Sequence, residues 1–149
     1  MNQFILVSMA FTGGVFLAIQ GSLNAQLGVL LKNPLLASLV AFFTSAFFAL
    51  LFVVGSVRNF PSISDLKTVP YHLWFAGGFF SLLGISLYYY TIPRLGVSSM
   101  ISLGLFGQII FAMIAGHFGW FDLPEEPLST RRVLGALAMI AGIFLINNK

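Results

Sequence analysis

The chain has 149 residues, of which 58% are hydrophobic and only 7% are charged, and it contains no cysteine. A soluble globular domain carries roughly 25% charged residues, so this composition excludes that class and indicates an integral membrane protein. The absence of cysteine excludes thiol catalysis and disulfides, and the net charge of +3 comes without the basic cluster that a nucleic-acid partner would need.

Five mostly apolar stretches follow one another along the chain, separated by short polar or proline-containing breaks. A helix that spans the bilayer needs about 20 such residues. There is no long linker, and the sequence therefore predicts a single all-α transmembrane domain over residues 1–149. We expect its helices at about residues 4–31, 34–57, 71–92, 96–116 and 131–146.

The first stretch carries three carboxamides, Gln20, Asn24 and Gln26, in a segment otherwise composed for lipid. Residues four apart share one face of a helix, so Gln20 and Asn24 point the same way while Gln26 faces elsewhere. Amides in hydrocarbon normally turn toward a bundle interior or a wet cavity, where they join helices or line a path. We interpret this face as the centre of the protein, and the residues alone leave solute binding and helix packing equally open.

The first two breaks have ordinary helix-boundary chemistry. At residues 32–34 the proline disfavours helical geometry in the residue before it and suits the start of the next helix. This tight loop predicts that the first two helices are antiparallel neighbours. The second break, residues 58–70, predicts a short interfacial turn capped by Ser62 or Ser64.

Two ionisable residues, Arg94 and His117, lie close to predicted helix ends. The third break, residues 93–96, contains Arg94, which could contact an anionic headgroup or a substrate but is more simply an interface anchor. His117 ends the fourth helix, where it could gate a pathway or serve as a solvated or capping side chain. After it, we expect Ser129 or Thr130 to cap the last helix.

Small residues recur at helical spacing inside the spans, which in membranes favours close helix packing. The stripe Gly135, Ala138 and Gly142 of the last helix is the candidate dimer contact. Another stripe, in the third helix, leads to Tyr88, a candidate for substrate contact. Gln108 is the only amide in the four later spans, and we predict that it meets Gln20 and Asn24.

Several motifs resemble one family over essentially the whole chain. They are LAIQGSLNAQLG at residues 17–28, IPRLGVSS at 92–99, GQ at 107–108, HFGW at 117–120 and RRVLGALAMIAGIFLI at 131–146. They resemble the YdcZ-like branch of the drug/metabolite transporter superfamily. The resemblance implies a multi-pass protein of the bacterial inner membrane, an exporter whose five helices equal one half of a ten-helix, EamA-like member. One position departs from the family pattern, since Gly116 stands where an acid often precedes His-Phe-Gly.

The titratable groups limit the chemistry. All four acids lie in loops, and the related small multidrug-resistance exporters use a glutamate where this first helix offers Gln20 and Asn24, which cannot titrate. Amides both donate and accept hydrogen bonds, so they suit a neutral, zwitterionic or lipid-like solute better than a bare cation. Tyr88, its two tyrosine neighbours and Trp74 could form a cation–π wall, but aromatic residues near a helix end are more often an interfacial belt.

Two functions are consistent with these residues. The first is a transporter of a small polar or amphipathic metabolite, whose site contains Gln20, Asn24, Gln108 and Tyr88. The second is a membrane scaffold, accessory or lipid-binding subunit that transports nothing. No catalytic, metal-ligand or phosphate-cradling pattern is present in the sequence, so we expect neither an enzyme nor a cofactor.

The basic residues also predict an assembly. Orientation in the membrane follows the excess of Lys and Arg in short loops. The N-terminal side would carry Arg58, Lys67, Arg131 and Arg132, and the opposite side Lys32, Arg94 and Lys149. Four basic residues against three hardly favour one orientation over the other, so the chain could insert into the membrane in both orientations. Two opposed copies would form the inverted repeat that transporters use for alternating access, and we expect an antiparallel homodimer in the lipid bilayer.

Overall fold

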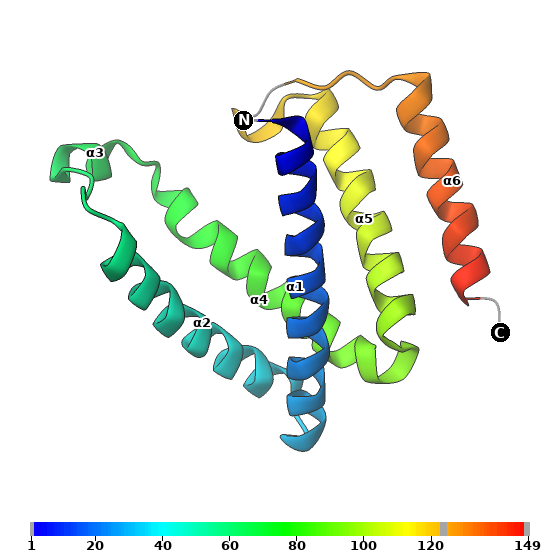
Figure 1. The fold of residues 1–149 in the computed structure, drawn as a ribbon, viewed down its shortest axis with the longest axis horizontal. Helices are drawn as coiled ribbons and strands as arrows, with labels where there is room; N and C mark the ends of the chain where they lie inside the picture. Colours follow the sequence, from blue (N-terminus) through cyan, green and yellow to red (C-terminus); the bar gives the residue numbers. More distant parts are fainter. Residues whose placement is uncertain (1, 123–124, 148–149) are drawn as a thin grey trace. The chain divides into compact units, whose positions relative to one another are not determined.

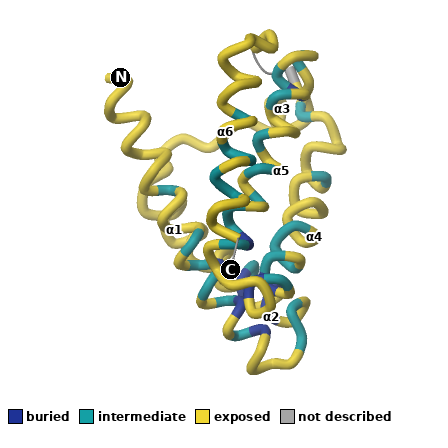
Figure 2. The backbone as a smooth tube through the Cα atoms, turned by 90° about the vertical axis from the view of Figure 1, so that its right-hand side faces the viewer, coloured by how far each residue is buried: buried dark blue, intermediate teal, exposed yellow. Residues whose placement is uncertain are grey.

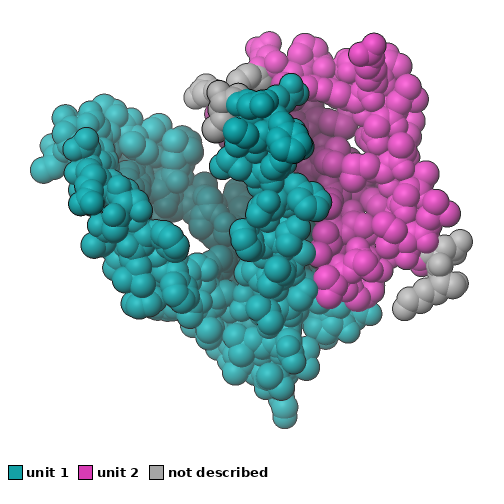
Figure 3. All heavy atoms as spheres, in the orientation of Figure 1, with its two compact units in different colours: residues 1–94 teal, residues 95–149 magenta. Residues whose placement is uncertain are grey.

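The computed structural model describes residues 2–122 and 125–147, and these are almost entirely helical. The elements are α1 (Gln3–Leu30), α2 (Pro34–Ser56), α3 (Ile63–Thr68), α4 (Tyr71–Leu95), α5 (Val97–His117), η1 (Trp120–Asp122) and α6 (Thr130–Asn147) (Figure 1). Of these, α1, α2, α4, α5 and α6 are long and apolar enough to cross a membrane, which confirms the five predicted spans. The chain divides into two compact units, residues 1–94 and 95–149 (Figure 3).

The turn between α1 and α2 is a Schellman motif. The N–H of Asn33 donates to the carbonyl of Gly28 at 3.0 Å, and the N–H of Lys32 donates to that of Val29 at 3.0 Å. This pattern requires a left-handed residue after the helix, normally glycine. Here Lys32 takes that position, with φ 52°.

The same turn begins α2. The side-chain oxygen of Asn33 accepts from the N–H of Leu35 at 2.9 Å and from that of Leu36 at 3.4 Å, and Pro34 is the first helical residue. Both devices satisfy or avoid N–H groups that a helix start leaves unpaired. The chain therefore reverses within three residues, and α1 and α2 pack as antiparallel neighbours, as predicted.

The buried core of the first unit lies in the halves of its helices near this turn (Figure 2). It consists of Gly21, Ala25 and Gly28 of α1, Ala37, Ser38 and Ala41 of α2, and Tyr89 and Ile92 of α4. All six that belong to α1 and α2 are small, which allows the backbones of these two helices to approach closely. Most of the large apolar side chains elsewhere on these helices are exposed, as expected of residues that face lipid.

The third helical span ends later than predicted. We expected α4 to end at residue 92, but it continues through Pro93 to Leu95. A proline in the last turn of a helix removes only one backbone hydrogen bond. The Arg94 side chain adds a hydrogen bond there by donating to the backbone carbonyl of Tyr90. The break is Gly96, whose φ of 89° is readily available to glycine.

The predicted caps of the remaining helices are confirmed. Ser62 caps α3 through a capping box, in which its hydroxyl accepts from the N–H of Asp65 at 3.2 Å and its own N–H donates to the Asp65 carboxylate at 3.0 Å. The Ser62 hydroxyl also donates to the Asp65 carboxylate at 2.6 Å, and this bond, together with the one from the Ser62 N–H, holds the pKa of Asp65 below its usual value. In the second unit, the Ser129 hydroxyl accepts from the N–H of Arg132 at 3.3 Å and caps α6, which packs on α5.

Candidate functional site

The centre of the first unit is a polar contact between α1 and α4. The amide nitrogen of Gln20 donates to the hydroxyl of Tyr89 at 2.5 Å, and the Asn24 side chain interacts with the same residue. Tyr89 is only 1% exposed, and both amides are half-buried. The predicted shared face of Gln20 and Asn24 therefore points at a neighbouring helix of the same unit.

A second polar contact joins α2 to α4. The hydroxyls of Ser38 and Ser86 lie 2.9 Å apart, and the Ser38 hydroxyl also donates to the carbonyl of Pro34 at 3.0 Å. A hydroxyl has one proton to donate, so Ser86 is the donor in the contact with Ser38. Ser38 is fully buried. Together the two contacts link all three membrane-spanning helices of this unit through uncharged groups.

The cluster of Gln20, Asn24 and Tyr89, which we call the amide–tyrosine cluster, contains no carboxylate, amine or imidazole. Its groups can donate and accept hydrogen bonds without carrying charge. Among the described residues, no buried side-chain nitrogen or oxygen lacks a hydrogen-bond partner. The cluster can therefore hold helices together as it stands, and its half-buried amides keep further donor and acceptor positions for a bound molecule.

A pocket of about 450 Å³ lies beside Tyr89, between the α1–α2 turn and the end of α4. We call it the basic pocket, because it contains two cations, Lys32 and Arg94. Its lining is Gly28, Val29, Lys32, Pro34, Tyr89, Tyr90, Pro93 and Arg94. The Arg94 guanidinium lies 3.6 Å from the centre of the Tyr90 ring and donates to the Tyr90 carbonyl, so its position is fixed by two contacts.

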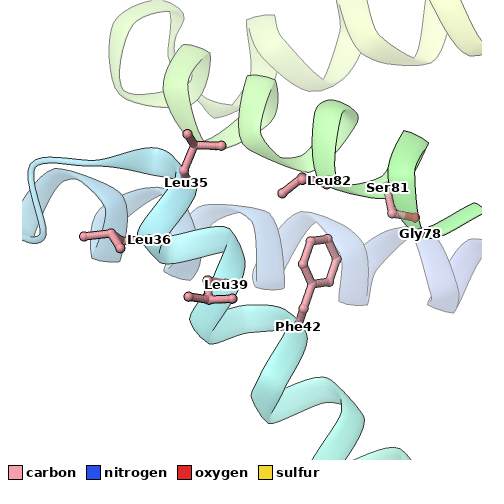
Figure 4. Close-up of a pocket in the computed structure, with 7 residues that line it drawn as sticks. All are labelled: Leu35, Leu36, Leu39, Phe42, Gly78, Ser81 and Leu82. Atoms are coloured by element: carbon pink, nitrogen blue, oxygen red, sulfur yellow. The ribbon is translucent and has the colours of Figure 1, made fainter. Parts of the chain in front are cut away.

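A second pocket, of about 650 Å³, lies between α2 and α4 and is almost purely apolar (Figure 4). It is lined by Leu35, Leu36, Leu39 and Phe42 of α2 and by Gly78, Ser81 and Leu82 of α4. The ring of Phe42 points toward Ser81 and Leu82. The apolar lining distinguishes this pocket from the basic pocket, and it offers almost nothing to orient a polar solute.

Two residues predicted to contact substrate are not members of the amide–tyrosine cluster. Gln108 is on α5 in the second unit, where its side chain is exposed and has an interaction partner. Its meeting with Gln20 and Asn24 stays a prediction. Tyr88 is half-buried on α4, but Tyr89 is the tyrosine that Gln20 contacts.

The contribution of Tyr89 was missed by the sequence reasoning, which named it only as part of an aromatic wall. A signal for it exists in the spacing of Ser86, Tyr89 and Ile92, which lie three residues apart and share one helix face. All three contact other helices of the unit: Ser86 contacts Ser38, Tyr89 contacts Gln20, and Ile92 lies against Gly21, 3.6 Å from the position of an added Cβ.

His117 connects the end of α5 to the segment that precedes α6. Its Nδ1 accepts from the N–H of Leu128 at 3.5 Å, and its ring packs edge-on against Phe118 with centroids 4.9 Å apart. Phe111, Trp120 and Phe121 extend this aromatic group, which is largely exposed. The arrangement is that of a helix-end histidine within an aromatic belt, and a gating role stays a prediction.

A later acidic residue lies beside Gly116. The Gly116 carbonyl accepts from the N–H of Glu126 at 2.8 Å, and the Glu126 carboxylate lies 3.9 Å from the place that a Cβ on Gly116 would occupy. That carboxylate forms an ion pair with Arg132 at 2.8 Å. An acidic group thus stands beside His-Phe-Gly even though Gly116 has no side chain.

The predicted dimer stripe lies on α6. Gly135 and Ala138 are exposed, and an added Cβ on Gly135 or Gly142 would meet no atom within 4 Å. The packing of α6 on α5 therefore leaves these two glycines uncovered. Their use as an interface between copies stays a prediction.

Neither a curated protein nor a solved structure shows a significant match to this chain. A family model does match, over residues 5–145, and its description is "Putative inner membrane exporter, YdcZ". The match includes all five membrane-spanning helices and the residues of both pockets. The chain therefore belongs to the YdcZ family of inner-membrane exporters, and it is a multi-pass protein of that membrane.

Proposed function

We propose that this protein exports a small neutral or zwitterionic metabolite, polar or amphipathic, and that the amide–tyrosine cluster contacts the solute. The observation that carries the proposal is the hydrogen bond between Gln20 and Tyr89, with Asn24 on the same tyrosine, inside a multi-pass member of the YdcZ family. Polar groups in a membrane-spanning bundle are costly, and they commonly mark a solute path.

The uncharged character of the cluster supports the class of solute. A bare cation would need a counter-charge in the low-dielectric interior, and none of the described acids lies in a membrane-spanning helix. A neutral or zwitterionic solute can instead exchange hydrogen bonds with the amides and the phenol. Tyr88 and Gln108 complete the proposed set of contact residues.

The working unit that we propose is a homodimer, with alternating access between two orientations of one solute site. Five helices equal one half of a ten-helix transporter, and inverted repeats supply the two states of such transporters. The balanced distribution of basic residues supports an antiparallel dimer, although Lys149, one of the residues in that balance, lies outside the described residues. The stripe Gly135, Ala138 and Gly142 is the proposed contact between copies.

The proposal is tested by thermal unfolding of purified protein in detergent against a panel of metabolites. A bound solute raises the unfolding temperature by mass action. We expect Asn24→Leu to abolish the shift produced by the active compound while the protein stays folded and dimeric. Gln26→Leu is the matched control, because Gln26 is an exposed amide on the same helix. A shift that survives in Asn24→Leu, or that Gln26→Leu removes equally, contradicts the proposal.

A scaffold or accessory subunit is the second candidate, and one observation favours it. Every buried side-chain donor and acceptor among the described residues already has a partner, which is what purely structural amides would show. Under this alternative Asn24→Leu leaves no monodisperse protein, and stabilisation comes from lipid or from a partner protein instead of from a solute.

A further inference from the structure

We propose that the basic pocket binds the phosphate group of a second ligand, at a site that borders the amide–tyrosine cluster at Tyr89 but binds through Lys32 and Arg94. Two cations from different elements line it: Lys32 from the α1–α2 turn and Arg94 from the end of α4. Within residues 2–122 and 125–147, neither cation forms an ion pair with a carboxylate. A cavity with two positive charges and no acid in its lining is complementary to an anion.

The backbone at Lys32 supports a functional role for that side chain. Its φ of 52° lies in the left-handed region, where lysine is strained and where glycine or asparagine would end the helix with less strain. The strain is maintained by the two Schellman hydrogen bonds to Gly28 and Val29. Strained residues of this kind are concentrated at binding sites, where the side chain provides something that glycine cannot.

Arg94 is pre-organised for the same ligand. Stacking on the Tyr90 ring and the bond to the Tyr90 carbonyl hold the guanidinium at the pocket, and a guanidinium has five N–H donors, of which this contact uses one. The remaining fork matches phosphate geometry.

The position of the pocket within the first unit favours phosphate over a smaller anion. It is formed where α1 ends, α2 begins and α4 ends, which is where we expect these spans to reach the headgroups, and its volume of about 450 Å³ accommodates a headgroup. The phosphate could belong to a membrane phospholipid or to a soluble phosphorylated compound. The two sources share the chemistry and are distinguished by experiment.

The test measures thermal unfolding of the full chain in a neutral detergent with two probes. One is inorganic phosphate, compared with sodium chloride at equal ionic strength. The other is dioleoyl phosphatidylglycerol in mixed micelles, compared with uncharged diolein. We expect at least one probe to raise the unfolding temperature, and Arg94→Gln to weaken its apparent affinity by roughly tenfold or more, because a charge-assisted hydrogen bond is lost.

Lys32→Gly is the second variant. It removes the charge without disturbing the fold, because glycine readily adopts the left-handed conformation at this position and preserves the turn. It should fold and still lose the response. Arg131→Gln is the control, because it removes the same charge from an exposed residue of the other unit. Asn24→Leu should keep the response, which separates this site from the proposed solute site.

A response to inorganic phosphate that both pocket variants lose supports the site and identifies a soluble ligand. A response to phosphatidylglycerol alone, lost in the same variants, supports the site and identifies a lipid. The proposal is overturned if neither probe stabilises the wild-type protein, if both pocket variants respond like wild type, or if Arg131→Gln loses the response to the same degree.

Discussion

The side-chain amide of Gln20 on α1 donates to the hydroxyl of Tyr89 on α4 at 2.5 Å, across 69 residues of sequence. This bond connects the first membrane-spanning helix to the third, with α2 bound to α4 by the neighbouring contact between Ser38 and Ser86. The first unit is thus specified by a few polar pairs placed among small residues. Each pair can be tested by a substitution that changes little else.

Tyr89→Phe removes one hydroxyl and leaves the Gln20 and Asn24 side chains without that partner. We expect it to destabilise the protein by about 1 kcal/mol or more, the cost of unpaired polar groups in a nonpolar environment. The measurement is the free energy of unfolding in detergent. Tyr90→Phe is the control, because Tyr90 is 48% exposed and its contact with Arg94 uses the ring and the backbone. Equal stability of both variants would show that the hydroxyl of Tyr89 contributes nothing.

Ser38→Leu places a large side chain where α2 meets α4. Ser38 is 0% exposed, so the added atoms have no space, and overpacking of this kind costs about 1 to 3 kcal/mol. We expect a lower unfolding temperature and a smaller yield of monodisperse protein. Ser45→Leu makes the same chemical change at an exposed position of α2 and should be tolerated. If Ser45→Leu is the more harmful change, the packing that we describe for α2 is incorrect.

The capping box of α3 should depend on pH. Since hydrogen bonds from Ser62 lower the pKa of Asp65 from its ordinary 3.8, the carboxylate stabilises α3 at all pH values above that ordinary pKa. This stabilisation is lost as the pH falls through the lower, folded pKa. A carboxyl-carbon NMR titration measures the shift, and Ser62→Ala should return the Asp65 pKa toward its ordinary value. Titration of the wild-type residue at its ordinary value would contradict the expectation.

The balance of basic residues predicts that the C-terminus is found on both sides of the membrane. Paired C-terminal reporters, one active only in the cytoplasm and one only outside it, should both give a signal. Adding two lysines to the 58–70 loop should then shift the population toward one orientation. A single active reporter in the unmodified protein would exclude dual topology and with it the antiparallel dimer.

Much of the fold follows from local sequence. The five spans, the tight turn at residues 32–34 and the caps at Ser62 and Ser129 all depend on chemistry within a few residues of each boundary. We predicted that α4 ends at residue 92, three residues too early, because proline usually ends a helix. That expectation omits the hydrogen bond from Arg94 to the Tyr90 carbonyl and the place of Gly96 as the residue that breaks the helix.

The site was less predictable, for a physical reason. In a soluble helix the apolar face identifies the core, but in a membrane both the buried and the lipid-facing sides are apolar, so periodicity does not tell which face of α4 meets α1. The polar residues Gln20 and Asn24 did indicate which face of α1 meets another helix. Nothing local distinguished Tyr89 from Tyr88, since the choice depends on how α4 is rotated about its axis.

In the first unit, α1 and α2 are packed against other helices at one end only, the end near the turn that joins them. Residues 3–12 of α1 and 43–56 of α2 are exposed throughout, so their separation can change with little loss of internal packing. Gln3 lies roughly 27 Å along the helix from Gly21, at 1.5 Å per residue. A rotation of about 5° near Gly21 therefore moves the far end of α1 by roughly 2 Å. The same rotation would displace the N-terminal end of α1 far more than it would displace Gln20 or Asn24.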